Sequence, residues 1–124
     1  MTNTTRQPVL HGIANCDTVR QARAWFDEQG RAYTFHDFKK QGVPLPALDA
    51  WIDALGWEAL VNRKGTTWRK LDEATRAGIA DAASARALML AQPSVIKRPV
   101  VQWPQGRLTV GFTGDQFAAN LGHS

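Results

Sequence analysis

The only cysteine of the chain, Cys16, is the residue with the clearest capacity for covalent chemistry. It stands in the segment GIANCDTVR, residues 12–20, between a short apolar run and residues with helical spacing. A cysteine at the start of a helix faces free backbone N–H groups and the positive end of the helix dipole. Both favour the thiolate, which is the nucleophilic form of cysteine. This position therefore favours a reactive sulfur over the buried, space-filling role that is common for a free cysteine.

The neighbours of this cysteine affect its charge in opposite directions. Arg20, four residues on, would share a helix face with Cys16 and favour the thiolate. Asp17 opposes this, because a nearby carboxylate disfavours a second negative charge. Asn15, Asp17 and Thr18 are good helix N-caps, and their backbone N–H groups are also candidate donors to a bound anion. Both interpretations of these three residues stay open at this point.

The sequence offers the sulfur no second thiol. A C-x-x-C pair would need a cysteine where Val19 stands. Any disulfide made by Cys16 must therefore use an outside sulfur, such as that of glutathione or of a partner protein. The histidines, which lie far apart without metal-ligand spacing, are His11, His36 and His123. No metal site is expected.

The composition is that of a single folded domain. A chain of 124 residues with 44% apolar and 21% charged residues is typical of one globular unit. The net charge of +4 is spread along the chain, which favours small anionic ligands over nucleic acid. No segment is apolar for long enough to cross a bilayer, and residues 1–8 lack the apolar run of a secretory signal. We therefore expect a cytoplasmic monomer with no nucleic-acid or membrane partner.

Hydrophobic periodicity predicts the elements that would carry Cys16. A strand is expected over residues 8–13, a helix over 17–29 ended by Gly30, and a second strand over 32–38. Strand, helix and strand in quick succession favour a parallel βαβ unit with a right-handed crossover. The loop after the first strand then delivers Cys16 to the start of the helix.

The middle of the chain is expected to be helical. The pattern predicts a loop over 39–46, a helix ended by Gly56, a further turn at 57–61 and a basic loop over 62–70. Weaker helices are predicted near 72–80 and 83–91. We interpret this tract, about 44–92, as an insertion between the two halves of the domain.

The last third is expected to complete the sheet. Strand-like composition over 93–103 precedes a hairpin turn at Pro104 and Gly106, and residues 108–110 form the return strand. A capping box over 113–116 then opens a final helix. The order β-α-β then β-β-α is that of a thioredoxin-like mixed sheet, so residues 1–124 are predicted to form one α/β domain of this class.

Three stretches of the chain resemble the ArsC/Spx family, the glutaredoxin-type arsenate reductases and their relatives. They are G-I-A-N-C-D-T-V-R (12–20), L-V-N-R-K-G (60–65) and I-K-R-P-V-V (96–101). The resemblance runs from about Val9 to Leu121 and is strongest to the short YffB-like members, which are proposed to be glutathione-dependent thiol reductases. It implies a thioredoxin-like fold, a thiolate at Cys16 and an anion pocket lined by Arg63 and Arg98.

The resemblance also assigns a place to Pro99. Thioredoxin-like folds have a cis-proline opposite the active cysteine, where the neighbouring backbone can pair with a bound peptide or with glutathione. Only about 5–6% of X-Pro bonds in folded proteins are cis, so the expectation of a cis Arg98–Pro99 bond depends on the resemblance. The reductant it implies is glutathione or a glutaredoxin-type thiol protein.

Two departures from the family pattern shape the functional hypothesis. Arsenate reductases of this class carry a third arginine just after the last strand, where this chain has no arginine over 109–115; Arg107 would replace it only by pointing inward. Spx-type regulators usually have a C-x-x-C switch, which Val19 removes. The leading hypothesis is a thiol-dependent reductase in which Cys16 attacks a disulfide or an oxyanion. The alternatives are a regulator that binds RNA polymerase without catalysis, and a true arsenate reductase.

Overall fold

The computed structural model describes residues 7–121 as two compact units. The first unit takes the chain up to Gln41 and again from Arg98 onward, and the second comprises Gly42–Lys97. Within the described residues, no helix combines the length and the apolar character that a membrane span requires.

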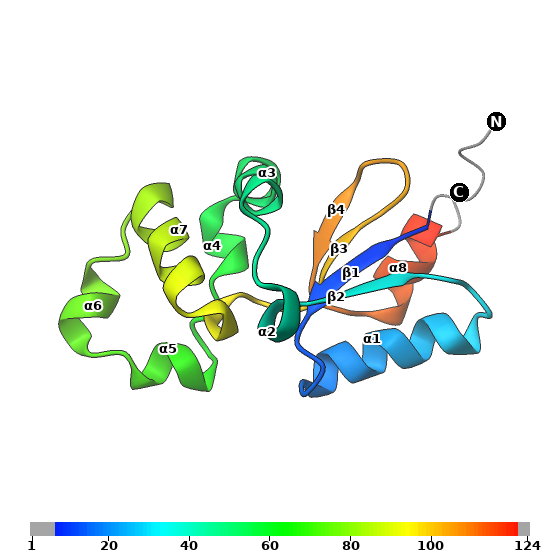
Figure 1. The fold of residues 1–124 in the computed structure, drawn as a ribbon, viewed down its shortest axis with the longest axis horizontal. Helices are drawn as coiled ribbons and strands as arrows, with labels where there is room; N and C mark the ends of the chain where they lie inside the picture. The colour runs from blue at the N-terminus through cyan, green and yellow to red at the C-terminus, as the bar shows by residue number, and fades with distance from the viewer. Residues whose placement is uncertain (1–6, 122–124) are drawn as a thin grey trace. The chain divides into compact units, whose positions relative to one another are not determined.

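A four-stranded sheet forms the centre of the first unit. Its strands, in the spatial order β2-β1-β3-β4, are β1 (Val9–Gly12), β2 (Thr34–Asp37), β3 (Val100–Gln102) and β4 (Leu108–Val110). β1 pairs parallel with β2 and antiparallel with β3, which pairs antiparallel with β4. Helix α1 (Asp17–Glu28) connects β1 to β2, and α8 (Gly114–Leu121) follows β4 (Figure 1). The expected thioredoxin-like α/β fold is confirmed.

Helices α1 and α8 cover one face of this sheet, as Figure 1 shows. Because side chains alternate along a strand, Leu10 of β1 and Val101 of β3, which pair in register, face the same side. They enclose a fully buried cluster with the apolar faces of both helices, which includes Val19, Ala22, Phe26, Trp103, Phe117 and Leu121. The rings of Phe26 and Phe117 lie 5.4 Å apart. This packing fixes the direction in which α1 leaves the sheet.

The side chain of His11 points to the other face of β1 from that of Leu10, and it is buried there. His11 is 4% exposed, and its Nδ1 lies 3.2 Å from the carbonyl oxygen of Val100, so the neutral tautomer with Nδ1–H donates to that oxygen. The ring lies 5.2 Å from that of His36 and stacks at 6.5 Å on Phe38 of the short helix α2 (Phe38–Gln41). Burial lowers the pKa of His11 to about 4; the bond to Val100 raises it in part, and His36 lowers it further.

Because His11 is buried, we expect the free energy of unfolding to decrease in acid. An unfolded histidine takes up its proton near pH 6.5, whereas folded His11 does so only near pH 4. The contribution of His11 to the free energy of unfolding should therefore be largest above pH 6.5 and fall as the pH drops from 6.5 to 4. Below pH 4 it should not change further. The loss should total about 3 kcal/mol. Urea unfolding at a series of pH values measures it.

Two variants isolate this contribution from that of the carboxylates, which titrate in the same range. His11→Asn should lose the part of the pH dependence that lies between pH 6.5 and 4. His36→Asn, which keeps the buried ring at position 11, should retain most of it. Equal pH dependence in the wild type and His11→Asn would contradict the assignment.

The second unit is built from helices. They are α3 (Leu45–Leu55), α4 (Trp57–Leu60), α5 (Thr66–Lys70), α6 (Glu73–Ala77), α7 (Ala82–Ala91) and the 3-10 turn η2 (Pro93–Val95). The unit has its own apolar interior, which includes the buried side chains of Leu48, Trp51, Leu60, Leu88, Met89 and Ile96. A single β-bridge joins Val61 to Ile96.

Three local predictions were wrong. The expected loop over 39–46 contains α2, because the Asp37 carboxylate accepts a hydrogen bond of 2.8 Å from the Lys39 N–H and starts a helical turn. The expected basic loop over 62–70 contains α5, whose first bond runs from the Arg69 N–H to the Gly65 carbonyl at 3.2 Å. The strand expected over 93–103 begins only at Val100, since η2 occupies the first residues of that range.

Candidate functional site

Cys16 lies at the junction between β1 and α1. It is the N-cap residue of α1, with an extended backbone (φ −143°, ψ 125°), and its carbonyl accepts the first helical hydrogen bond from the Arg20 N–H at 2.9 Å. The residue is partly exposed and forms no disulfide. Part of its surface packs against the apolar cluster under α1. The sulfur is therefore held in place and open to solvent, as a nucleophile requires.

Arg98 reaches the sulfur from the far end of the sequence. Val100 pairs with His11, and the antiparallel direction of β3 carries residue 98 past the end of β1, where Cys16 follows. The Arg98–Pro99 peptide bond is cis, which confirms the expectation from the resemblance. Pro99 is buried, and its carbonyl accepts a bond of 2.8 Å from the Gly111 N–H. The strand entry is thus anchored to the chain that follows β4.

The surroundings of Cys16 favour its thiolate. Partial burial raises the pKa of the thiol, but this is outweighed by the backbone N–H of Val19, by the hydrogen bond and positive charge of Arg98, and by the N–H of Thr18. The net pKa lies below the ordinary value for cysteine. Because Cys16 is the residue before α1, it lies where the free amides of the first turn can stabilise a negative charge.

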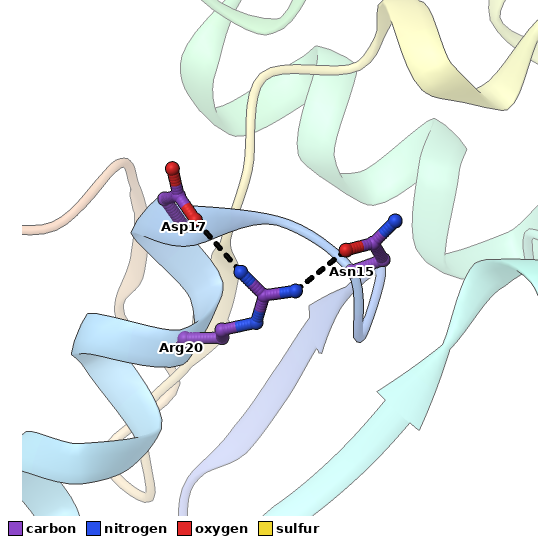
Figure 2. Close-up of polar contacts among 3 residues, drawn as sticks. All are labelled: Asn15, Asp17 and Arg20. Atoms are coloured by element: carbon purple, nitrogen blue, oxygen red, sulfur yellow. Dashed lines mark hydrogen bonds and ion pairs between the residues drawn. The ribbon is translucent and has the colours of Figure 1, made fainter.

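The guanidinium of Arg20 contacts two residues that flank Cys16. Its guanidinium donates to the carboxylate of Asp17 at 2.7 Å and to the side-chain oxygen of Asn15 at 2.5 Å, as Figure 2 shows. The positive charge of Arg20 is therefore paired with the carboxylate of Asp17, the residue that opposes a thiolate at position 16. The side chains of Asn15 and Asp17 flank the cysteine and are linked through Arg20. The backbone N–H groups of Thr18 and Val19 are the part of this turn directed at the sulfur.

Arg63 belongs to the second unit, so its predicted place in an anion pocket with Cys16 stays a prediction. It is exposed on the turn after Val61, and its guanidinium lies 5.4 Å from the Trp57 ring centroid. A hollow of about 340 Å³ here is lined by Glu58, Ala59, Val61, Asn62, Arg63, Lys64 and Lys97. Lys64 and Lys97 line this hollow and were not predicted as site residues, although they lie in the motifs that contain Arg63 and Arg98.

Arg107 does not lie beside Cys16. The register pairs Gln102 with Val9, so the hairpin that follows Gln102 lies at the other end of β1 from the cysteine. The exposed guanidinium of Arg107 donates to the side-chain oxygen of Asn120 at 3.1 Å. The inward orientation that would let it replace a third anion-binding arginine is absent. Within the described part of the chain, residues 7–121, no group of three His, Cys, Asp or Glu side chains is arranged to hold a metal.

A family model and known proteins match nearly the whole of this chain. The sequence model of the ArsC family matches residues 11–120, which include Cys16, Arg63 and Arg98. The chain belongs to the ArsC family. An uncharacterized protein of Haemophilus influenzae is 34% identical over 110 residues, which cover 89% of this chain and 95% of that protein.

Solved structures of the same family share the fold. The structure described as YFFB (PA3664) protein is 51% identical, with a TM-score of 0.85, and the match covers 92% of this chain and 98% of that one. An arsenate reductase (ArsC) related protein from Brucella melitensis is 49% identical, with a TM-score of 0.74, and the match covers 94% and 96% of the two chains. These likenesses extend over nearly the whole chain and include both units.

Proposed function

We propose that this ArsC-family protein is a thiol-dependent oxidoreductase that reduces mixed disulfides, with Cys16 as its nucleophile and glutathione as its reductant. The observation that carries the proposal is the convergence of Arg98 and the first amides of α1 on a partly exposed sulfur whose pKa is lowered. Family membership and the likeness to an arsenate reductase-related protein support a thiol-dependent oxidoreductase activity. To this activity our proposal adds the identity of the reductant, glutathione, and of the substrate, a mixed disulfide.

The reaction consists of two thiol–disulfide exchanges. The Cys16 thiolate attacks the glutathione sulfur of a mixed disulfide R–S–S–G, the Cys16–S–S–G bond forms, and R–S⁻ leaves and takes a proton from solvent. A glutathione thiolate then attacks the glutathione sulfur of this adduct, oxidised glutathione forms, and Cys16 leaves as thiolate. Because the chain has one cysteine, the second thiol must come from outside. The low pKa of Cys16 also makes it a good leaving group in the second exchange.

Positive charge suits a glutathionylated substrate, since glutathione carries two carboxylates that a guanidinium can bind. Arg98 is the cation that acts on Cys16 itself. Arg63 is proposed as a second anion-binding arginine on the strength of its family motif. Arsenate is less favoured as substrate than a disulfide, because Arg107 bonds to Asn120 at the other end of the sheet.

The test uses the mixed disulfide of glutathione and 2-mercaptoethanol, with glutathione, glutathione reductase and NADPH. Turnover of NADPH that depends on the protein, together with a single glutathione adduct on Cys16 in the intact mass spectrum, is the expected result. Protein alkylated at Cys16 beforehand serves as the control and should be inactive. Two results would contradict the proposal. One is turnover of arsenate without turnover of the disulfide, and the other is no adduct and no turnover with either substrate.

A further inference from the structure

Gly12, the last residue of β1, lies against α1, the helix whose N-cap residue is Cys16. A Cβ atom built on Gly12 would lie 2.8 Å from Cγ2 of Val19 and 3.6 Å from its Cγ1. Real Cβ atoms essentially never lie closer than 3.0 Å to such a neighbour, so a side chain at position 12 would force a displacement. The backbone of Gly12 does not have a positive φ, so the requirement for glycine here comes from the close approach of α1 alone.

The surroundings decide which of the two partners would move. β1 is hydrogen-bonded on both sides, to β2 and to β3, and Gly12 itself pairs with Asp37. The side chain of Val19 is fully buried among Leu10, Phe26 and Phe117, and a β-branched side chain has little rotational freedom in a helix. On the first turn of α1, by contrast, Asp17 and Arg20 are exposed, so fewer packed neighbours resist a displacement there.

We propose that Gly12 is a positioning residue for Cys16: because it has no side chain, the first turn of α1 can approach β1 closely enough for its amides to lie at the sulfur. Val19, which lies against Gly12, is also the residue whose N–H faces Cys16. A methyl group at position 12 would push Val19, and its N–H with it, away from the position that stabilises the thiolate. This inference deepens the proposed function, because it concerns the reactivity of the same sulfur.

The test measures the sulfur itself, by the pH dependence of Cys16 alkylation with iodoacetamide. Gly12→Ala should shift the curve to higher pH and slow alkylation at pH 6 by about two- to tenfold, the range for losing one backbone hydrogen bond. Alkylation needs no reductase activity. A negative result here is therefore distinguishable from a failure of the proposed disulfide substrate.

Two further variants separate positioning from general destabilisation. Leu121→Ala, on α8, removes buried methyl groups from the same apolar cluster and lowers the melting temperature without changing β1 or the first turn of α1, so its alkylation curve should match that of the wild type. Gly12→Ala/Val19→Ala removes the atoms that clash, because the Val19 Cβ lies 3.8 Å from the added methyl. The double variant should recover the wild-type curve despite its lower stability.

A shifted curve in Gly12→Ala that returns in the double variant is the result expected. An unshifted curve in Gly12→Ala, or the same shift in Leu121→Ala, would overturn the proposal. If Gly12→Ala does not fold, the double variant decides: a curve that coincides with that of the wild type is expected, and a curve shifted to higher pH would overturn the proposal.

Discussion

Cys16→Ser should reduce the glutathione-coupled turnover of a mixed disulfide to the uncatalysed background, a loss of at least about a thousandfold. The serine hydroxyl is not ionised near neutrality and cannot form the disulfide intermediate, whereas the thiolate is the attacking species. No second cysteine in the chain can substitute for it. The NADPH-linked assay measures the rate, and mass spectrometry should find no glutathione adduct on the variant.

The fold of this variant should be unchanged, because the side chain at position 16 is partly exposed and makes no capping hydrogen bond. Circular dichroism and the melting temperature check this. If Cys16→Ser kept a tenth or more of the wild-type rate, the sulfur could not be the nucleophile. Retention of a specific interaction with RNA polymerase in such a variant would instead favour the regulatory alternative.

Arg98→Met should raise the pKa of Cys16 and lower the disulfide reductase rate at pH 7 by roughly tenfold. A hydrogen bond that involves a charged group contributes about 1.5–3 kcal/mol, and each 1.4 kcal/mol is a factor of ten. We take the low end because the sulfur is partly exposed and water screens the charge. The alkylation curve of the variant should lie at higher pH than that of the wild type, and the two rates should converge in alkaline solution, where both thiols are ionised.

Arg107→Met is the matched control, since it removes an arginine from the same unit at the far end of the sheet. It should leave the alkylation curve unchanged. Arg98→Lys should lie between the wild type and Arg98→Met, because lysine keeps the charge but lacks the planar fork of donors. Equal curves for Arg98→Met and the wild type would exclude Arg98 from the activation of Cys16.

The sequence predicted the sheet and its flanking helices well, because each depends on a strong local pattern. The spacing of Val19, Ala22 and Phe26 defines the buried face of α1, and Pro104 with Gly106 marks the β3–β4 hairpin. The errors concern segments whose structure depends on single hydrogen bonds. The turn of α2 starts at a bond between the Asp37 carboxylate and a backbone N–H, which periodicity does not detect.

Two structural features of the candidate site were expected from the sequence and the resemblance, and the contacts of two residues were missed. Cys16 at a helix start and the cis Arg98–Pro99 bond were expected. The partners of Arg20 were not expected. Its long side chain can reach residues both three and five positions away, and sequence spacing alone does not say which of them it binds. The tight contact between Gly12 and Val19 was also missed, since a glycine in a strand gives no sign of which atoms approach it.

The pairing of β1 with β3 has a consequence for the order in which the protein matures. The bond between His11 and Val100 joins residues 89 positions apart, and contacts of such long range form late and slowly. Arg98 lies just before β3, so its guanidinium reaches Cys16 only when β3 joins β1. Activation of the sulfur is therefore expected to follow the formation of this long-range pairing, and not the formation of β1 and α1 alone.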